Sequence, residues 1–339
     1  MATPRIVCFG ELLLRLSAPG RELLLQSPRL DVCVGGAEAN VAVALAHFGH
    51  VVNMVSTVAS NELGEAARGE LRRHGIDTRH VAAGHGRMGL YFLQTGASQR
   101  PSQVLYDRAN SAFALATPES YDWSNLLDGA RALHVSGVTP AVGPNAAAAA
   151  IAAVHAAREH GIHVVFDSNY RSKLWQAWDS DPPSVLREIF FCADTVFADH
   201  RDFALVLGSD FSSEPPERVA SSAAAAAFDA FPQLQRIVST QRVQHSVDNH
   251  DIGASLVTRT HTLKAASVHI TGIVDRIGTG DAFAAGVLHG LFSGMSEQDS
   301  LNFGLAAGCL KHSIPGDFFA LGAKEVNEFL AERRFDVRR

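Results

Sequence analysis

The chain has 339 residues, 47% hydrophobic and 19% charged, with a formal net charge of -6. This composition is typical of a globular protein with a sizeable core, and it provides no basic surface to attract nucleic acid or an anionic membrane. No apolar run approaches the roughly 18 residues that cross a membrane, and no signal peptide is apparent. The four cysteines lack C-x-x-C spacing, so we expect reduced thiols in a cytoplasmic protein.

Strand-like and helix-like segments alternate along most of the chain. Such alternation predicts an α/β fold, in which a mostly parallel sheet is flanked by helices. Short apolar runs predict strands at 6–9, 51–58, 133–137, 163–167, 195–198 and 236–240. Periodic or alanine-rich runs predict helices at 41–48, 145–160, 186–192 and 220–231, and a further helix that ends at residue 75.

Two segments, residues 12–34 and 87–111, do not fit this alternation because they are strand-like but half polar. We interpret them as exposed strands that pair into a small accessory sheet, a β lid. The remaining residues, 1–11, 35–86 and 112–339, then form the α/β core. An accessory sheet has edges that a second subunit can cover, so we expect a homo-oligomer, a dimer or higher, formed through the lid.

Residues 277–286, Ile-Gly-Thr-Gly-Asp-Ala-Phe-Ala-Ala-Gly, combine a Gly-x-Gly turn, an acid and the start of an apolar helix. The first turn of a helix carries unpaired N–H groups and partial positive charge, so it can hold a phosphoryl group. Asp281 at this junction is placed to accept a proton. An ordinary loop-to-helix turn with an N-terminal acid explains the same spacing equally well.

Two further motifs precede or follow predicted elements at places where ligands bind. Gly35 and Gly36 open a helix and allow close backbone approach to a polyol, whose hydroxyls the Asn40 amide could bind. Residues 167–171 follow an apolar strand, and the planar guanidinium of Arg171 suits an anion at the carboxyl edge of the sheet. The alternatives are a turn before an amphipathic helix and a capping cluster.

Taken together, these motifs resemble the signatures of the ribokinase (PfkB) family of sugar kinases over nearly the whole chain. Residues 35–45, Gly-Gly-Ala-Glu-Ala-Asn-Val-Ala-Val-Ala-Leu, are similar to the N-terminal signature. Residues 275–283, Asp-Arg-Ile-Gly-Thr-Gly-Asp-Ala-Phe, are similar to the C-terminal signature. Within the family, segments 35–38, 104–109 and 169–175 most resemble 2-keto-3-deoxygluconate kinases.

The resemblance implies a Rossmann-like ribokinase fold with a small β-sheet lid, and it implies ATP and Mg²⁺, with a monovalent cation as an option. It assigns Asp281 as the base that takes a proton from a primary sugar hydroxyl, and the backbone N–H groups of Gly278, Thr279 and Gly280 as an anion hole. The implied substrate-binding residues are Gly35, Gly36, Asn40, Tyr91, Tyr106, Arg108, Arg171, Asp281 and Asp317. The implied cofactor-binding residues are Asn169, Arg171, Ser239, Thr240, Gly278 and Gly280.

Three places depart from the family pattern. Thr279 stands where the anion-hole motif usually has alanine, and residues 239–245 replace a glycine-rich nucleotide loop. Asp199 and Asp202 stand where the family has an Asn-x-x-Glu motif that supports Mg²⁺. Because two carboxylates attract a hard cation, Asp199 and Asp202 are the predicted metal ligands.

We therefore expect ATP-dependent phosphorylation of the terminal hydroxyl of 2-keto-3-deoxygluconate, which gives 2-keto-3-deoxy-6-phosphogluconate. Tyr106 and Arg108 fall on one face of a strand-like run, where the tyrosine could bind a carbonyl or hydroxyl and the arginine a carboxylate. A surface arginine paired with a nearby acid is the alternative reading of Arg108. The alternative functions are a fructokinase-like or ribokinase-like enzyme, and a non-catalytic sugar-binding protein of this fold.

Overall fold

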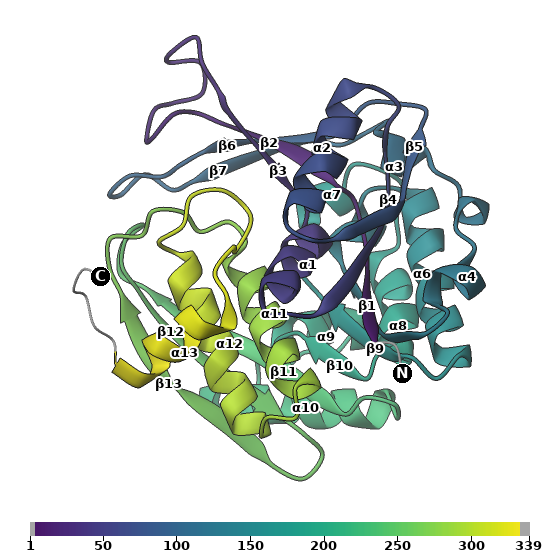
Figure 1. The fold of residues 1–339 in the computed structure, drawn as a ribbon. Helices are drawn as coiled ribbons and strands as arrows, with labels where there is room; N and C mark the ends of the chain where they lie inside the picture. Colours follow the sequence, from purple (N-terminus) through teal and green to yellow (C-terminus); the bar gives the residue numbers. More distant parts are fainter. Residues whose placement is uncertain (1–3, 333–339) are drawn as a thin grey trace.

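A nine-stranded sheet runs through the centre of the computed structural model, which describes residues 4–332 (Figure 1). Seven adjacent strands, with β5 at the sheet edge and β11 innermost of the other side, are parallel to one another. Strands β12 and β13 extend the sheet beyond β11 in antiparallel fashion. From one edge to the other the strands are β5 (Asp77–Gly84), β4 (Val51–Ala59), β1 (Arg5–Phe9), β8 (Ala130–Ser136), β9 (His163–Asp167), β10 (Thr195–Phe197), β11 (Arg236–Gln244), β12 (His250–Val257) and β13 (Thr262–Ile270).

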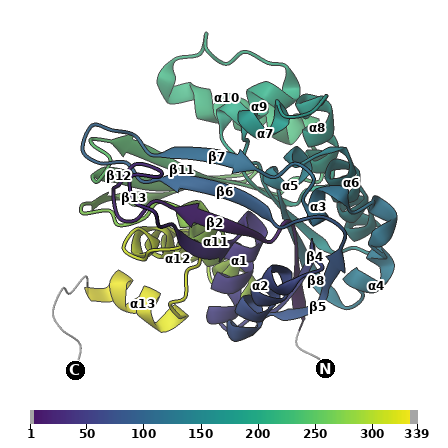
Figure 2. The same ribbon diagram turned by 90° about the horizontal axis from the view of Figure 1, so that it is seen from above.

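Helices cover both faces of this sheet (Figure 2). One layer contains α1 (Ala37–His47), α2 (Glu62–Arg73), α11 (Thr279–Phe292), α12 (Glu297–Lys311) and α13 (Ala323–Glu332). The other contains α3 (Ala112–Leu115), α4 (Trp123–Leu127), α5 (Val138–Ala141), α6 (Pro144–Glu159), α7 (Ser172–Trp175), α8 (Pro182–Cys192), α9 (His200–Leu207) and α10 (Pro216–Ala230), with a 3₁₀ turn at Pro118–Ser120. No helix of the described range 4–332 is long and apolar enough to cross a membrane.

The central strands supply a separate hydrophobic core to each helical layer. In β1, Ile6 and Cys8 belong to one core, whereas Val7 and Phe9 belong to the other. Successive side chains of a strand point to opposite faces, so a fully apolar strand must be covered on both sides. The expected α/β architecture is confirmed, and the apolar run at the start of the chain is explained by burial on both faces.

The predicted accessory sheet is present and has four strands, two from each predicted segment. They are β3 (Asp31–Gly35), β2 (Leu13–Ser17), β6 (Gly89–Gln94) and β7 (Gln103–Asp107), in this order. The pairing is mixed, because β2 and β6 are parallel while the two outer pairs are antiparallel. We call this sheet the β lid.

The expectation that 12–34 forms only exposed strands is wrong for β2. Leu13 and Leu14 are buried, because β2 lies in the middle of the β lid and its residues pack in two directions. Leu14 joins the core around α1 and α11, and Leu13 joins a small apolar cluster with Tyr91 and Leu93. Within β2, whose sequence is Leu-Leu-Arg-Leu-Ser, Arg15 interrupts the apolar residues, so the pattern of the strand does not indicate burial in two directions.

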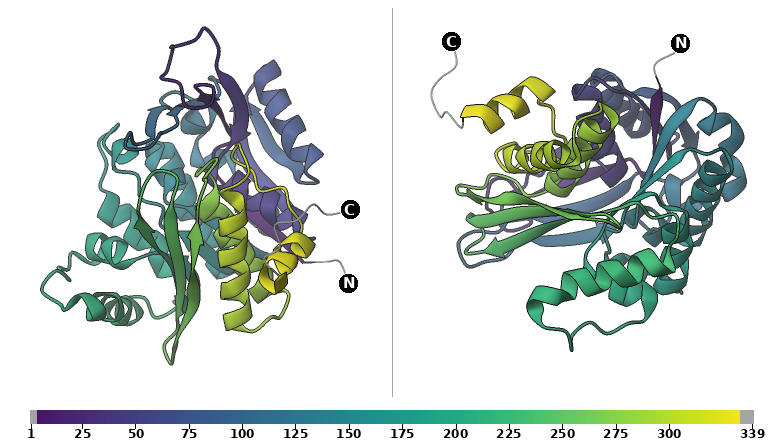
Figure 3. Two further views of the ribbon diagram at one scale, coloured as in Figure 1. Left: turned by 90° about the vertical axis from the view of Figure 1, so that its left-hand side faces the viewer. Right: turned by 90° about the horizontal axis from the view of Figure 1, so that it is seen from below.

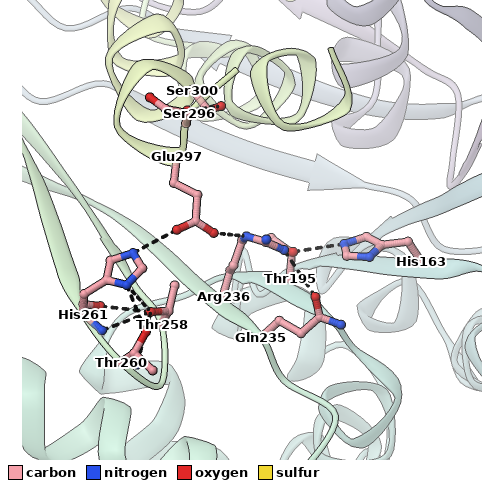
Figure 4. A network of polar contacts seen from close by, with 10 residues as sticks. All are labelled: His163, Thr195, Gln235, Arg236, Thr258, Thr260, His261, Ser296, Glu297 and Ser300. Carbon is pink, nitrogen blue, oxygen red and sulfur yellow. Dashed lines mark hydrogen bonds and ion pairs between the residues drawn. The ribbon is translucent and has the colours of Figure 1, made fainter. Parts of the chain in front are cut away.

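Sequence reasoning did not assign β5, β12 and β13. The long β12–β13 hairpin lies beside α12 (Figure 3). Glu297, in the first turn of α12, ties it to the sheet by accepting a bond from Arg236 Nε at 2.6 Å and contacting His261 Nε2 at 2.9 Å (Figure 4). These polar contacts of Glu297 with Arg236 and His261 join the start of β11, the hairpin turn and α12.

Helices α11 and α12 are packed so closely that glycine is required at their contact. A Cβ atom at Gly286 would lie 2.7 Å from Gly304 Cα, and one at Gly304 would lie 2.8 Å from the Phe283 carbonyl oxygen. Backbone atoms cannot move away as a flexible side chain can. Close packing of these two helices holds the start of α11 in place.

We predict opposite effects of two Gly→Ala substitutions in helices. Gly286→Ala should lower the free energy of unfolding by about 1–3 kcal/mol, because it overpacks the α11–α12 contact. Gly69→Ala in α2 is the matched control, since its Cβ would meet only Arg72 Nη2 at 3.8 Å. The control should raise the free energy of unfolding by about 0.5–1 kcal/mol through helix propensity. Urea denaturation measures both, and a neutral Gly286→Ala would contradict the packing argument.

Candidate active site

A cleft of about 1190 Å³ lies between the β lid and the carboxyl ends of the parallel strands. Its lining comes from the ends of β9, β10 and β11, from the start of α11, and from β2, β6 and β7 of the lid. In open α/β sheets, ligands bind at this edge of the sheet. The cleft is therefore the candidate active site.

The N-terminus of α11 opens into this cleft. Gly278 is the N-cap, with a left-handed φ of 77°, and a Cβ there would lie 2.1 Å from the Asp317 carbonyl oxygen. No side chain caps the helix, so the N–H groups of its first turn remain available to a ligand. Gly278, Thr279, Gly280 and Asp281 all line the cleft. The arrangement has the donors and the partial positive charge that an anion requires.

Asp281 is a buried carboxyl held by one amide. Asn40 Nδ2, from α1, donates a hydrogen bond to Asp281 Oδ2 at 2.6 Å. The pKa of Asp281 is raised to about 7, because burial and the charge of Glu38 together outweigh the opposing effect of the Asn40 hydrogen bond. A carboxyl with a pKa near neutrality can either hold or release a proton at neutral pH, as a general acid or base must.

Asp167, at the end of β9, is a second carboxyl of the cleft, and it was absent from the predicted site residues. Burial, followed by the charge of Asp281, raises the pKa of Asp167 to about 8, against an opposing effect of Arg171. Among the described residues, none donates a hydrogen bond to the Asp167 side chain. Its position as the last residue of a buried strand was a usable signal, since ligand-binding groups gather at that edge of the sheet.

Arg108 is neither a surface arginine nor an unpaired one. It follows β7, is 6% exposed, and donates from Nε to the carboxylate of Glu11, which is 1% exposed. The expected alternative of a surface ion pair is therefore wrong about the burial but right about the presence of an acid. Tyr106 and Arg108 both line the cleft, as the strand pattern predicted. Sequence reasoning missed Glu11, which lies 97 residues away.

Asp317 belongs to a buried network beneath the lid. It accepts a hydrogen bond from the Tyr91 hydroxyl at 2.7 Å and pairs with Arg15 Nη1 at 3.1 Å. Arg15 also pairs with Asp275 at 2.8 Å. Gly35 faces this network, because a Cβ there would lie 2.2 Å from Asp317 Oδ2. The network fixes the Tyr91 side chain in the wall of the cleft, and Arg15 was not among the predicted residues.

Asp199 and Asp202, the predicted metal ligands, form a capping box at the start of α9. Asp202 accepts hydrogen bonds from the Asp199 backbone N–H and from Ser168 Oγ, both at 2.8 Å. Asp199 pairs with Arg201. Both aspartates line the cleft, but their oxygens already serve the helix N-terminus. Their role as metal ligands stays a prediction.

The remaining predicted residues fall into the same cleft with one exception. Gly35 lies behind the cleft wall, against Asp317, instead of in the lining. Asn169 has a left-handed φ of 36°, and the Arg171 side chain beside it is exposed. The predicted residues that line the cleft are Gly36, Asn40, Tyr91, Tyr106, Arg108, Asn169, Arg171, Asp199, Asp202, Ser239, Thr240, Gly278, Thr279, Gly280, Asp281 and Asp317.

Comparison with known proteins agrees with this geometry. Residues 3–318 match the family described as pfkB family carbohydrate kinase. This chain belongs to that family. The chain is therefore a carbohydrate kinase, and ATP use is expected of such an enzyme.

Named relatives are similar over almost their whole length. The 2-dehydro-3-deoxygalactonokinase of Haloferax volcanii is 32% identical, with 97% of each chain covered. The crystal structure of 2-dehydro-3-deoxygluconokinase from Thermotoga maritima is 36% identical, with a TM-score of 0.89 and coverage of 96% of this chain and 99% of that one. A putative 2-keto-3-deoxygluconate kinase from Enterococcus faecalis is 28% identical, with a TM-score of 0.91 and 99% of each chain covered.

We predict that Asn40 sets the pH dependence of this kinase. If Asp281 is the catalytic base, it must be ionised, so kcat/KM should rise with pH through an apparent pKa of about 7. Asn40→Ala removes a hydrogen bond to the ionised carboxyl, so it should move this rise to higher pH. The pH profile of kcat/KM in both proteins is the measurement. A reduced amplitude with an unchanged midpoint would mean that Asn40 only binds sugar.

Proposed function

We propose that this carbohydrate kinase transfers the terminal phosphoryl group of ATP to the terminal hydroxyl of 2-keto-3-deoxygluconate. The observation that carries the proposal is one cleft with an anion-binding helix end and Asp281 on one side and Tyr106 and Arg108 on the other. The names of the Thermotoga and Enterococcus relatives support the same substrate class. The Haloferax relative, named for the galacto compound, makes the epimeric sugar acid the second candidate.

In this proposal Asp281 takes the proton of the attacking hydroxyl. Its carboxyl is ionised in a useful fraction at neutral pH, and burial makes it a stronger base than an exposed aspartate. The N–H groups of Gly278, Thr279 and Gly280 stabilise negative charge on the transferred group. Phosphoryl transfer depends mainly on such positioning and charge stabilisation.

The cleft also suits Mg²⁺, which neutralises phosphate charge when bound. Mg²⁺ is a hard cation that prefers oxygen ligands. Asp167 lines the cleft, and its carboxyl oxygens accept no hydrogen bond from the described residues, so they are available as metal ligands. A nearby cation would offset the repulsion by the Asp281 charge that contributes to the raised pKa of Asp167. We propose Asp167 as a residue that would hold Mg²⁺, with Asp199 and Asp202 as the earlier candidates; a monovalent ion stays an option.

The test is ADP release across 2-keto-3-deoxygluconate, its galacto epimer, fructose, ribose and a nucleoside. The sugar acids should give the highest kcat/KM. Asp281→Asn keeps the side-chain shape but not the base, so kcat should fall about 10²–10⁴-fold, the range for general-base catalysis. Highest activity on fructose or ribose would favour the alternative sugar kinases, and no ADP release from any substrate would favour a binding protein.

We predict that Arg108 selects sugar acids over neutral sugars. A single Arg108→Ala would leave the Glu11 carboxylate buried and unpaired, which harms folding by itself. The Glu11→Gln, Arg108→Gln double variant removes both charges of the buried pair. Its control, Glu11→Gln, keeps a side-chain oxygen that can accept from Arg108 Nε, and melting curves establish that both variants are folded before activity is compared. Relative to that control, the double variant should lose about 30-fold or more in kcat/KM on the sugar acid, since losing a desolvated charge partner costs about 2–5 kcal/mol.

Residual turnover of fructose should hardly change, because fructose has no carboxylate. Equal losses on both sugars would assign Arg108 to lid structure alone.

We also propose that the enzyme is at least a dimer, associated through the β lid. The outer strands β3 and β7 carry exposed apolar side chains, with Val32 and Leu105 each 60% exposed. Unpaired strand edges and exposed apolar residues favour association. Light scattering at micromolar concentration should give at least twice the 36.2 kDa chain mass. A monomeric mass would contradict this, and Val32→Lys should shift a true dimer towards monomer.

A further inference from the structure

We propose that His245, Asp251 and His269 form a binding site for one divalent transition-metal ion of the zinc class. The three residues lie at one end of β11, β12 and β13, and none of them lines the catalytic cleft. Nothing in the family resemblance or in the phosphoryl-transfer proposal requires such an ion there. The argument rests on strand register, on distances and on ligand chemistry.

The strand register places the three side chains on one face of the sheet. Asp251 on β12 is directly opposite His269 on β13 and directly opposite Val243 on β11. His245 is two residues beyond Val243, so its side chain points to the same face as Val243 and Asp251. Two strands that are hydrogen-bonded to one another thus hold Asp251 and His269, and His245 is the first residue after β11, at the start of the turn that leads to β12.

The distances bring the three donor atoms together. Asp251 Oδ2 lies 2.6 Å from His245 Nε2, and Asp251 Oδ1 lies 2.6 Å from His269 Nδ1. The ligand atoms all lie within 4.8 Å of one another. A zinc ion sits about 2.0–2.2 Å from nitrogen and oxygen ligands, so small side-chain rotations suffice to place one ion between them.

The donor set determines the kind of ion. Two imidazole nitrogens with one carboxylate suit zinc and its transition-metal neighbours, whereas Mg²⁺ and Ca²⁺ prefer oxygen ligands. Side chains of His245 and His269 are 48% and 59% exposed, so an ion can reach them from solvent and water can complete the coordination. Without an ion, the Asp251 carboxylate is held by its contacts with the two imidazoles, and this is the competing explanation of the cluster.

The site would brace one rim of the catalytic cleft. Arg242 and Gln244 on the outer half of β11 line the cleft, as do Val247 and Asp248 in the turn that leads to β12. An ion between the three residues would link this turn to β13. We therefore expect zinc to stabilise the folded enzyme, without a part in the phosphoryl-transfer chemistry itself.

The test uses the full-length chain without a histidine tag, stripped with a chelator and titrated with Zn²⁺ by calorimetry. One ion per chain should bind, and Co²⁺ in its place should show the visible absorption of a low-coordinate nitrogen–oxygen site. Asp251→Asn and His269→Gln should each weaken zinc binding by about 10–100-fold or more. Loss of a group that only hydrogen-bonds a metal ligand already has an effect of this size. Zinc should also raise the melting temperature of the wild type, but not of these variants.

The exposed His85 supplies the matched control, since His85→Gln removes an imidazole outside the cluster. This variant should bind zinc as the wild type does, and excess Mg²⁺ should not compete. Melting curves in chelator establish that each variant is folded before zinc is added. The proposal would be overturned if the wild type did not bind zinc, or if Asp251→Asn and His269→Gln bound zinc as strongly as the wild type does. The cluster would then be a polar surface group without a bound ion.

Discussion

The candidate site depends on acidic side chains that are buried near the C-terminal ends of the parallel strands. Burial raises the pKa of Asp281, Asp167, Asp317 and Glu38, so each resists ionisation unless the protein supplies a donor. Asn40 donates a hydrogen bond to Asp281, and Ser136 and Thr139 donate to Glu38. Asp317 accepts a hydrogen bond from Tyr91 and pairs with Arg15. Asp167 receives no such donor within the described chain. This asymmetry indicates where positive charge from a ligand would be most strongly stabilised.

Close backbone approach is the second requirement, and it changes the meaning of the glycine motifs. Position 278 requires glycine for two reasons: its φ is left-handed, and the Asp317 carbonyl oxygen leaves no room for a Cβ atom. Gly35 is needed because the Asp317 carboxylate occupies the place of a side chain. Both signatures therefore pack against the same residue, which links the start of α1 to the start of α11. A pattern that suggests phosphate binding also reports how tightly these elements pack.

The parts of this site that depend on local sequence were predictable, and those that depend on distant partners were not. The start of α11, with Asp281 at its first turn, follows from a turn and an apolar run that are adjacent in the chain. The Glu11–Arg108 pair and the burial of β2 follow from tertiary packing over long separations, which periodicity cannot reveal. Likewise, the Asp199 and Asp202 spacing suggested metal ligands, while the same spacing is also that of a helix capping box.

The Glu11–Arg108 pair also bears on how an anionic sugar can bind. Within residues 4–332, Glu11 is the hydrogen-bond partner of the Arg108 side chain, through Nε alone. A guanidinium has five N–H donors in a planar fork, so the Nη atoms remain for a second carboxylate. The substrate need not separate the buried pair, which would leave Glu11 uncompensated at a large cost. Glu11 instead orients the guanidinium and balances its charge, so that the pair as a whole is neutral. A bound carboxylate is then recognised chiefly by the geometry of the remaining donors, which discriminates between sugar acids better than charge alone.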